Sequence, residues 1–226
     1  MSSAAVIVAA GSGTRFGEGL PKQFRELGGR PVLDWACAAF RKHPRIQQVI
    51  VVVAAHVAAE PPEWLGELAD HVVEGGESRR ESVGRGIAAV DRGVERILVH
   101  DGVRPFVSSA LIERVWEAAA HGAVVPVIPV ADALKEVGGG RVIRTLARDG
   151  LARAQTPQGF PAGLLRRVHR EAERENEDAP DDAALCEARG EPVCAVGGDP
   201  HNLKITTPED LAFAEWLLRA GRLTRG

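Results

Sequence analysis

The chain alternates short, almost continuously apolar runs with segments in which apolar residues recur every three or four positions. The short runs are typical of strands buried on both faces of a parallel sheet, and the periodic segments are typical of amphipathic helices. Strands are predicted at residues 4–10, 48–54, 71–74, 96–100, 123–130, 192–196 and 203–205. Helices are predicted to begin at Pro31, Glu63, Ser78, Ser109, Pro161, Asp181 and Thr207. This alternation predicts one α/β domain, residues 1–226, in which helices flank a mostly parallel sheet.

The pattern changes between residues 131 and 150. Two short β-like runs there, residues 134–137 and 141–144, flank three consecutive glycines, which predicts a protruding β-hairpin. An isolated hairpin is marginal in water, so we expect this arm to pack on something outside its own domain. Its apolar residues have no predicted cover: Val137, Val142, Ile143 and Leu146. Two such arms related by a two-fold axis would bury these faces, so the pattern predicts a homodimer.

Composition excludes several classes of protein. With 226 residues, of which 45% are hydrophobic, the chain can bury the core of one large domain. The net charge of -3 provides no basic field for nucleic acid. The first residues lack the positive region of a signal peptide, and the longest aliphatic run is far shorter than the ~20 residues of a membrane helix. Three cysteines without a C-x-x-C pair predict a reduced, cytoplasmic protein in which all three are buried: Cys37, Cys186 and Cys194.

Lysine is scarce among the 28 basic residues, because arginine supplies all but Lys22, Lys42, Lys135 and Lys204. A lysine inside a motif is therefore notable, since the two side chains are not interchangeable. Lys22 closes the loop "AAGSGTRFGEGLPK", residues 9–22, which follows the first predicted strand. The loop matches neither the P-loop nor the G-x-G-x-x-G dinucleotide motif. Its glycines would let backbone N–H groups approach an anion, and Arg15 and Lys22 add positive charge; a tight turn with exposed basic residues is the alternative.

Three further segments follow predicted strands, where ligands bind in open α/β sheets. A glycine pair at residues 75–76 precedes a predicted helix N-terminus, a weak signal alone because many such turns look alike. Asp101 ends a hydrophobic strand and suits a Mg²⁺ ion shared with substrate phosphates, or else caps a turn and pairs with Arg104. Lys204 precedes a helix cap and is either a ligand-binding residue or an ordinary strand-edge lysine. Together the four segments predict a site that binds a nucleoside triphosphate with Mg²⁺ and without a P-loop. No two histidines have the spacing of zinc ligands, so the sequence does not indicate a zinc site.

Five segments in this order carry a family resemblance: "AAGSGTRFG…PKQF", "GGESRRESV", "HDGVRPFV", "AQTPQGFP" and "NLKITTPEDLAFAE". Their order and spacing, over residues 4 to 219, resemble the 2-C-methyl-D-erythritol 4-phosphate cytidylyltransferase family. The opening loop alone resembles only the broader nucleotidyltransferase superfamily. The resemblance implies a Rossmann-like fold and transfer of CMP from CTP to a sugar-alcohol phosphate, with release of pyrophosphate and with Mg²⁺ on the triphosphate.

The resemblance also implies roles for particular residues. Those expected to surround the cytidine and phosphates are Ala10, Gly11, Gly76, Glu77 and Ser82. Arg15 and Lys22 would stabilise the charged transition state, and Asp101 would lie near the metal, directly or indirectly. Lys204 and Arg148 would position the attacking phosphate, while Arg104 and Thr156 would bind the acceptor. The hairpin would be a dimerisation arm that places Arg148 in the active site of the partner.

Three positions depart from the family pattern and concern the acceptor. Ala133 and Pro180 stand where threonine is common, and His201 stands where an acidic residue often precedes Asn202. The alternatives are therefore a cytidylyltransferase for another pentitol phosphate, such as ribitol 5-phosphate, or a nucleotide-binding module without catalysis. A pure sensor could dispense with some of the charged residues that this chain retains: Arg15, Lys22, Asp101 and Lys204.

Overall fold

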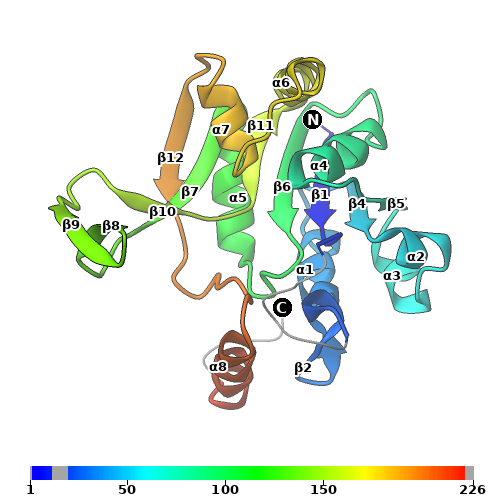
Figure 1. Cartoon of the computed structure of the whole chain (residues 1–226). Helices are drawn as coiled ribbons and strands as arrows, with labels where there is room; N and C mark the ends of the chain where they lie inside the picture. Colours follow the sequence, from blue (N-terminus) through cyan, green and yellow to red (C-terminus); the bar gives the residue numbers. More distant parts are fainter. Residues whose placement is uncertain (1, 12–19, 222–226) are drawn as a thin grey trace.

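The computed structural model describes residues 2–11 and 20–221. Within them, eight strands form one sheet in the order β10-β7-β11-β6-β1-β4-β5, with β12 beside β7 (Figure 1). The strands are β1 (Ser3–Val8), β4 (Gln48–Val53), β5 (His71–Glu74), β6 (Arg96–Asp101), β7 (Ala123–Pro129), β10 (Ala152–Ala154), β11 (Gln158–Pro161) and β12 (Val193–Gly197). Pairings of β1 with β4 and β6, of β4 with β5 and of β7 with β12 are parallel. The predicted mostly parallel α/β sheet is confirmed.

Helices cover both faces of this sheet, which explains why β4 is buried along its whole length. On one face Val6 and Val52 pack in a cluster with α4 (Arg79–Ala88), α6 (Ala162–Glu175) and α7 (Asp182–Glu187). On the other face Ile7 and Val51 pack with α1 (Val32–Arg41), α3 (Glu63–Leu68) and α5 (Ser109–Ala118). Successive residues of one strand point to opposite faces, so two helix layers require the uninterrupted apolar runs seen in the sequence.

Three smaller elements flank the layers. The helix α2 (Ala55–Ala59) follows β4, and the short strands β2 (Glu26–Leu27) and β3 (Arg30–Pro31) pair with each other after the 3₁₀ turn Lys22–Phe24. The last helix, α8 (Pro208–Arg219), packs beside β2 and α1 through a separate apolar cluster that includes Leu27, Trp35 and Leu217. No helix within the described part of the chain is long and apolar enough to cross a membrane.

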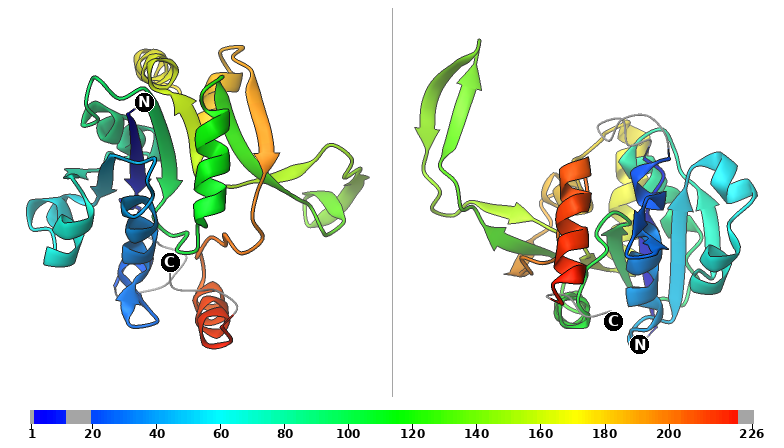
Figure 2. Two further views of the ribbon diagram at one scale, coloured as in Figure 1. Left: turned by 180° about the vertical axis from the view of Figure 1, so that it is seen from behind. Right: turned by 90° about the horizontal axis from the view of Figure 1, so that it is seen from below.

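The predicted hairpin is present as β8 (Leu134–Gly138) paired with β9 (Arg141–Leu146). Gly139 and Gly140 form its turn with φ of 55° and 73°, a conformation that favours glycine. The hairpin protrudes from the body of the molecule (Figures 1 and 2). Val137, Val142 and Ile143 are 62%, 60% and 62% exposed in the single chain. The arm is thus confirmed as a structural feature, and dimerisation through it stays a prediction.

The structure corrects three local predictions. Residues 203–205 form no strand, and their one backbone hydrogen bond toward the sheet among the described residues runs from Ile205 N to Val103 O. Ser108, not Ser109, caps α5, because its side chain accepts from Leu111 N. Cys194 is exposed, since β12 lies at the edge of the sheet and pairs only with β7 among the described strands.

The antiparallel strands β10 and β11 are the main elements that the pattern missed. β11 reads Gln-Gly-Phe-Pro, which lacks the β-branched run of a central strand, yet it pairs with both β6 and β7. Its glycine is required by packing: a Cβ at Gly159 would lie 2.7 Å from Cγ1 of Val115 and 2.9 Å from Cγ1 of Val124. Tertiary context therefore overrides the weak local propensity of this segment.

Two glycines of α4 generate a prediction about stability. A Cβ at Gly86 would lie 2.5 Å from Cγ1 of Val6 and 2.8 Å from Cγ2 of Val52, so Gly86→Ala should overpack the helix against the sheet and lower the free energy of unfolding by about 1–3 kcal/mol. A Cβ at Gly84 would meet only Nδ1 of His169, at 3.8 Å. Gly84→Ala should therefore raise the free energy of unfolding by about 1 kcal/mol, because alanine has the higher helix propensity. Urea denaturation of the two variants measures both changes, and shifts of the same sign would contradict this account of the packing of α4.

Candidate active site

A cavity of about 430 Å³ opens where the carboxyl ends of β1, β5 and β6 meet. Because these three strands run in the same direction, the segments that follow them converge on one edge of the sheet. The predicted residues that line the cavity are Ala10, Gly11, Lys22, Gly76, Glu77, Ser82, Asp101 and Lys204. Arg15 lies outside the described residues. The structure therefore brings together most of the residues chosen from the sequence.

The segment after β1 is held in place by a buried glutamine. Gln23 is 2% exposed, and its Nε2 donates to Ala9 O at 2.7 Å and to Gly11 O at 3.1 Å. Ala9 N in turn donates to Val52 O at 2.7 Å, which fixes the start of the loop to β4. Sequence analysis included Gln23 in a motif without assigning it a role, although its place next to Lys22 is a usable signal. Its hydrogen bonds present the backbone at Gly11 to the cavity.

The turn after β5 requires its two glycines. A Cβ at Gly75 would lie 2.2 Å from the Cβ of Ala10, and a Cβ at Gly76 would lie 2.4 Å from the Cβ of Glu81. Ser82 fixes the turn, because its Oγ accepts from Gly76 N at 3.1 Å and donates to Ser78 O at 2.9 Å. The turn therefore approaches both the opening loop and α4 more closely than any larger residue permits.

The helix α4 begins at this turn, where Ser78 and Glu81 have the spacing of a capping box of which only half is formed. Ser78 caps the helix and accepts from Glu81 N at 3.2 Å. The Glu81 carboxylate does not return to Ser78 N; its Oε2 accepts from Glu77 N at 2.9 Å instead. Glu81 therefore holds the backbone of a cavity-lining residue and couples the turn to the helix.

Asp101 is the carboxylate at the centre of the site. It ends β6 and is 8% exposed, with Oδ2 2.8 Å from Lys204 Nζ and 3.5 Å from Arg104 Nε, and Oδ1 3.7 Å from Arg79 Nε. Burial alone would raise the pKa of this carboxyl, but the three cations outweigh burial and hold its pKa below the ordinary value. Asp101 is thus ionised, and it fixes Lys204 beside the cavity.

Arg104 and Thr156 support Asp101 and do not themselves line the cavity. Thr156 Oγ1 accepts from Asp101 N at 3.0 Å, and Arg104 Nη1 donates to Asn202 O at 2.8 Å. Asn202 is fully buried, and its Nδ2 donates to Thr156 O at 2.7 Å. This network joins the end of β6 to the segment that carries Lys204. Both predicted acceptor residues are therefore next to the cavity, on the far side of the carboxylate.

The same network contains a buried histidine. His100 is fully buried, its Nδ1 lies 3.1 Å from Thr156 Oγ1 and its Nε2 lies 3.1 Å from Arg104 O. Burial lowers the pKa of His100 to about 4, so the ring is neutral at pH 7. A neutral ring has one N–H to donate and one nitrogen to accept, which is what a carbonyl and a hydroxyl require.

Arg79 is a cavity residue that sequence analysis missed. Its Nη1 donates to Oδ2 of Asp182 at 2.8 Å, and Oδ1 of Asp182 lies 2.9 Å from Nε2 of His169. Asp182 is 1% exposed; burial would raise its pKa, but the charge of Arg79 and the hydrogen bond from His169 keep that pKa below the ordinary value. The signal for Arg79 was its position in the second motif, directly after the helix cap. Nothing local signalled Asp182, which lies 103 positions later in the chain.

The remaining predicted residues lie elsewhere. Arg148 is exposed on the segment that returns from the arm, where Nη1 donates to Ala131 O, and it does not line the cavity of its own chain. The three positions that depart from the family pattern do not line it either: Ala133, Pro180 and His201. Within the described residues, no cluster of three or more His, Cys, Asp or Glu side chains forms a metal site. The cavity offers two carboxylates, Asp101 and Glu77, to a cation that arrives with a substrate.

Comparison with known proteins places this chain in a family. The sequence model of 2-C-methyl-D-erythritol 4-phosphate cytidylyltransferase matches residues 3–220. A protein of that name from Thermus thermophilus is 44% identical over 220 residues, which are 97% of this chain and 98% of the relative. A bifunctional enzyme IspD/IspF from Solidesulfovibrio magneticus is 45% identical over 225 residues, 94% of this chain but only 56% of that longer protein.

Solved structures agree with the sequence comparison. The crystal structure of 2-C-methyl-D-erythritol 4-phosphate cytidylyltransferase from Thermus thermophilus has a TM-score of 0.82 and 42% identity, covering 95% of this chain and 98% of that one. The structure of 4-diphosphocytidyl-2C-methyl-D-erythritol synthase from Anaerococcus prevotii has a TM-score of 0.84 and 31% identity, covering 96% of each chain. The fold, the order of the motifs and the converging strand ends lead to one conclusion: this chain belongs to the 2-C-methyl-D-erythritol 4-phosphate cytidylyltransferase family.

Proposed function

We propose that the protein transfers CMP from CTP to 2-C-methyl-D-erythritol 4-phosphate, which yields 4-diphosphocytidyl-2-C-methyl-D-erythritol and pyrophosphate in the non-mevalonate isoprenoid pathway. The family match over residues 3–220 supports the reaction. The observation that carries the proposal is the cavity itself, because Lys22, Arg79 and Lys204 meet there beside glycine-rich backbone and the ionised Asp101. Cations and preorganised N–H groups are what a polyanionic transition state needs.

The nucleotide would occupy the part of the cavity formed by Ala10, Gly11, Gly76, Glu77 and Ser82. Backbone groups at the two glycine turns can read the polar edge of a pyrimidine, since both turns approach the cavity without side chains. The contact between Gly75 and Ala10 keeps the two turns together, which favours the smaller base over a purine. The base pocket therefore supports a pyrimidine nucleotide, and the cytidylyltransferase family match supports CTP.

The acceptor phosphate is already an oxyanion at neutral pH, so the reaction needs no strong general base. One of its oxygens forms a bond to the α-phosphorus of CTP, the bond from that phosphorus to the bridging oxygen breaks, and pyrophosphate leaves with the electron pair. The barrier is the approach of two anions and the charge on the leaving group. Lys22, with Arg15, would stabilise that charge, and Lys204 would position the attacking phosphate.

The carboxylate Asp101 and the triphosphate form a donor set that fits Mg²⁺, which commonly shares itself between one carboxylate and substrate phosphates. When bound, the ion would neutralise part of the triphosphate charge. Asp101 also orders Lys204 at 2.8 Å, so removing the carboxylate would affect the attacking side of the reaction as well. Arg104 and Thr156, which support Asp101, lie where the acceptor would enter beyond it.

The arm completes the proposal. Its exposed apolar residues, Val137, Val142 and Ile143, would pack against the arm of a second copy, which buries surface that the single chain leaves in water. Arg148 lies outside the cavity of its own chain, and a two-fold arrangement of arms would bring it to the partner's cavity as a second ligand of the acceptor phosphate. We therefore expect a homodimer with shared active sites.

The direct test of the proposed function is release of pyrophosphate from each nucleoside triphosphate with a panel of acceptors. We expect turnover with CTP and 2-C-methyl-D-erythritol 4-phosphate. Turnover should be much slower with ATP or GTP, because the two turns leave too little space for a purine, and with UTP, because backbone groups that read the polar edge of cytosine do not match that of uracil. Ribitol 5-phosphate is the competing acceptor. Comparable rates with ATP, or a preference for ribitol 5-phosphate, would contradict the proposal; absence of turnover with every acceptor would favour a binding module.

Three of the four lysines of the chain provide a matched mutational test. Lys22→Ala and Lys204→Ala should each lower kcat by about two to four orders of magnitude, since each removes preorganised charge at the transition state. Lys42→Ala is the control, because Lys42 is exposed after α1 and does not line the cavity. Lys22→Arg should also be impaired, as a planar guanidinium does not replace a compact ammonium. Steady-state kinetics with CTP measure all four variants, and equal rates for the three alanine variants would refute these roles.

Subunit mixing tests the shared site. Arg148→Ala and Lys22→Ala proteins should each be nearly inactive, but a mixed dimer would hold one site with both lesions and one with neither. With random exchange half of the dimers are mixed, so activity should recover to about a quarter of the wild-type value. Sedimentation and exchange of labelled subunits provide the control. A monomer, or no recovery after proven exchange, would place Arg148 outside the chemistry of a partner.

A further inference from the structure

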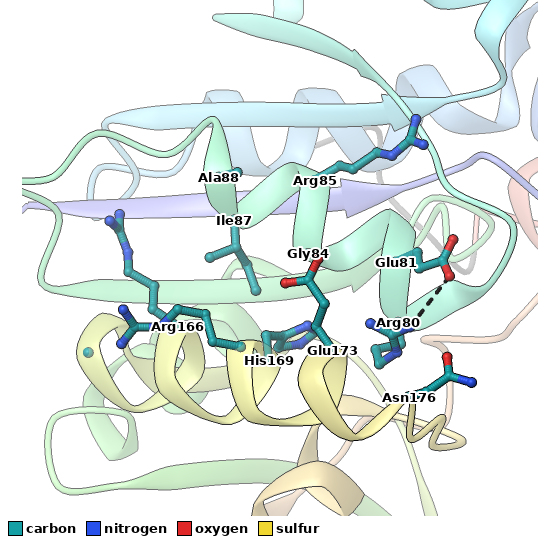
Figure 3. Close-up of a pocket in the computed structure, with 12 residues that line it drawn as sticks. Arg80, Glu81, Gly84, Arg85, Ile87, Ala88, Arg166, His169, Glu173 and Asn176 are labelled. Atoms are coloured by element: carbon teal, nitrogen blue, oxygen red, sulfur yellow. Dashed lines mark hydrogen bonds and ion pairs between the residues drawn. The ribbon is translucent and has the colours of Figure 1, made fainter.

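A second and larger cavity lies on the other side of the N-terminal part of α4. It is a groove of about 780 Å³ between α4 and α6, and none of its lining residues lines the active-site cavity (Figure 3). From α4 it receives Arg80, Arg85 and Ile87, and from α6 it receives Arg166, His169 and Arg170. The proposed reaction uses none of these side chains, so the groove has no role in the function described above.

The groove carries positive charge with unused donors. Four arginines and His169 line it, opposed by two carboxylates, Glu81 and Glu173. Arg80 is only 9% exposed, yet its Nε has no hydrogen-bond partner among the described residues, and its Nη2 reaches Glu81 Oε1 only at 3.4 Å. A buried guanidinium with unsatisfied N–H groups is costly, and it is stabilised by an anion that accepts from them.

Two of the other three arginines also keep unused donors, whereas Arg85 is paired through Nη1 with Gly75 O at 3.0 Å and with Glu74 Oε1 at 3.3 Å. Arg166 Nη2 donates to Val90 O at 3.0 Å and to Asp91 O at 2.9 Å, while its buried Nε has no partner within the described chain. Arg170 is exposed and makes no hydrogen bond or ion pair with the described residues. Guanidinium groups match phosphate oxygens in pairs, and an excess of arginine over glutamate favours a ligand with several negative charges.

We propose that the groove between α4 and α6 binds a small molecule that carries a diphosphate group, and that its occupancy weakens nucleotide binding in the active-site cavity. The second half of this statement rests on the proposed function, whereas the first half does not. Two chains of contacts connect the groove to the cavity, and each begins at a groove residue.

The first connection runs through Glu81. One carboxylate oxygen of Glu81 faces Arg80, and the other accepts from Glu77 N in the turn that lines the active-site cavity. An anion bound by Arg80 repels the Glu81 carboxylate and competes for the same guanidinium. Glu81 would then release Glu77 N, and the turn that reads the nucleotide would lose its support.

The second connection runs through Asp182. His169 lines the groove and lies 2.9 Å from Asp182 Oδ1, while Asp182 Oδ2 accepts from Arg79, which lines the cavity. Arg79 in turn faces Asp101 at 3.7 Å. An anion beside His169 competes with Asp182 for the N–H of this ring, so the hydrogen bond between Asp182 and Arg79 changes with occupancy. Both connections therefore act on the nucleotide side of the cavity.

Binding is tested with inorganic pyrophosphate as the probe and the side-chain NMR signals of His169 as the reporter, in the absence of nucleotide. The wild-type protein should show a saturable shift, and Arg170→Ala should bind at least tenfold more weakly. Arg174→Ala is the matched control, because Arg174 is an exposed arginine of the same helix that does not line the groove. Equal affinities of the Arg170→Ala and Arg174→Ala variants, or no shift at His169 in the wild type, would overturn the site.

Two further probes separate the sources of the diphosphate. ADP presents the same group on a nucleoside, and inorganic phosphate presents half of its charge. Tighter binding of ADP than of pyrophosphate assigns a nucleotide to the groove, and tighter binding of pyrophosphate assigns the free anion. Inorganic phosphate should bind more weakly than either, and binding as tight as that of pyrophosphate would contradict a diphosphate site.

Coupling is tested with cytidine, which carries no phosphate and so does not compete for the groove. By reciprocity, saturating cytidine should weaken pyrophosphate binding at His169 by a factor of about five or more, within the usual range of coupling between sites. Glu81→Gln should reduce this factor. An unchanged affinity overturns the coupling while the binding result stands. If calorimetry detects no cytidine binding at all, the nucleotide pocket of the proposed function has failed and not the groove.

Discussion

The buried carboxylate of Asp101 is the charge around which the site is organised. An isolated buried carboxylate costs several kcal/mol, and here it is offset by the neighbouring Arg104 and by two cations from distant parts of the chain, Arg79 and Lys204. Because the carboxylate ends a central strand, it also fixes where those segments meet. Lys204 has no strand or helix of its own, and its position depends on this ion pair and on the hydrogen bonds of Asn202. The ionised Asp101 thus determines both the position of the segment that carries Lys204 and the distribution of charge in the site.

The elements that could be predicted are those whose local pattern agrees with their tertiary setting. β4 and β5 begin at the predicted residues, 48 and 71. The Gly-rich hairpin and the Thr207 cap of α8 are also present as expected. The strand β11 could not be predicted, because Gln-Gly-Phe-Pro has no strand pattern and pairs only when β6 and β7 are already in place. Residues 203–205 show the reverse, since an apolar pair there fills a small cluster beside α8 instead of joining the sheet.

The candidate site divides in the same way. Residues directly after strands could be found from the sequence, because parallel strands deliver their ends to one edge: Gly11, Gly76 and Asp101. Asp182 and His169 could not, since they approach Arg79 only through the packing of α6 and α7 on α4. Gly86 permits that packing to be tight, as it seats α4 directly on Val6 and Val52. A helix held so closely to the sheet transmits small displacements of its first turn instead of absorbing them.

The place where the arm leaves the sheet has a consequence for how such chains diversify. β7 and β10 are paired antiparallel, with Pro129 opposite Ala152, so the two ends of the intervening excursion lie one strand spacing apart. Everything between them can lengthen, shorten or change its sequence without altering the register of the sheet, because loop closure costs little once the two ends are fixed. The arm that we propose as the dimer contact can therefore be replaced without disturbing the sheet. Assembly can thus evolve in this fold without changing the sheet, as long as Arg148 keeps the place that we propose for it in the partner's cavity.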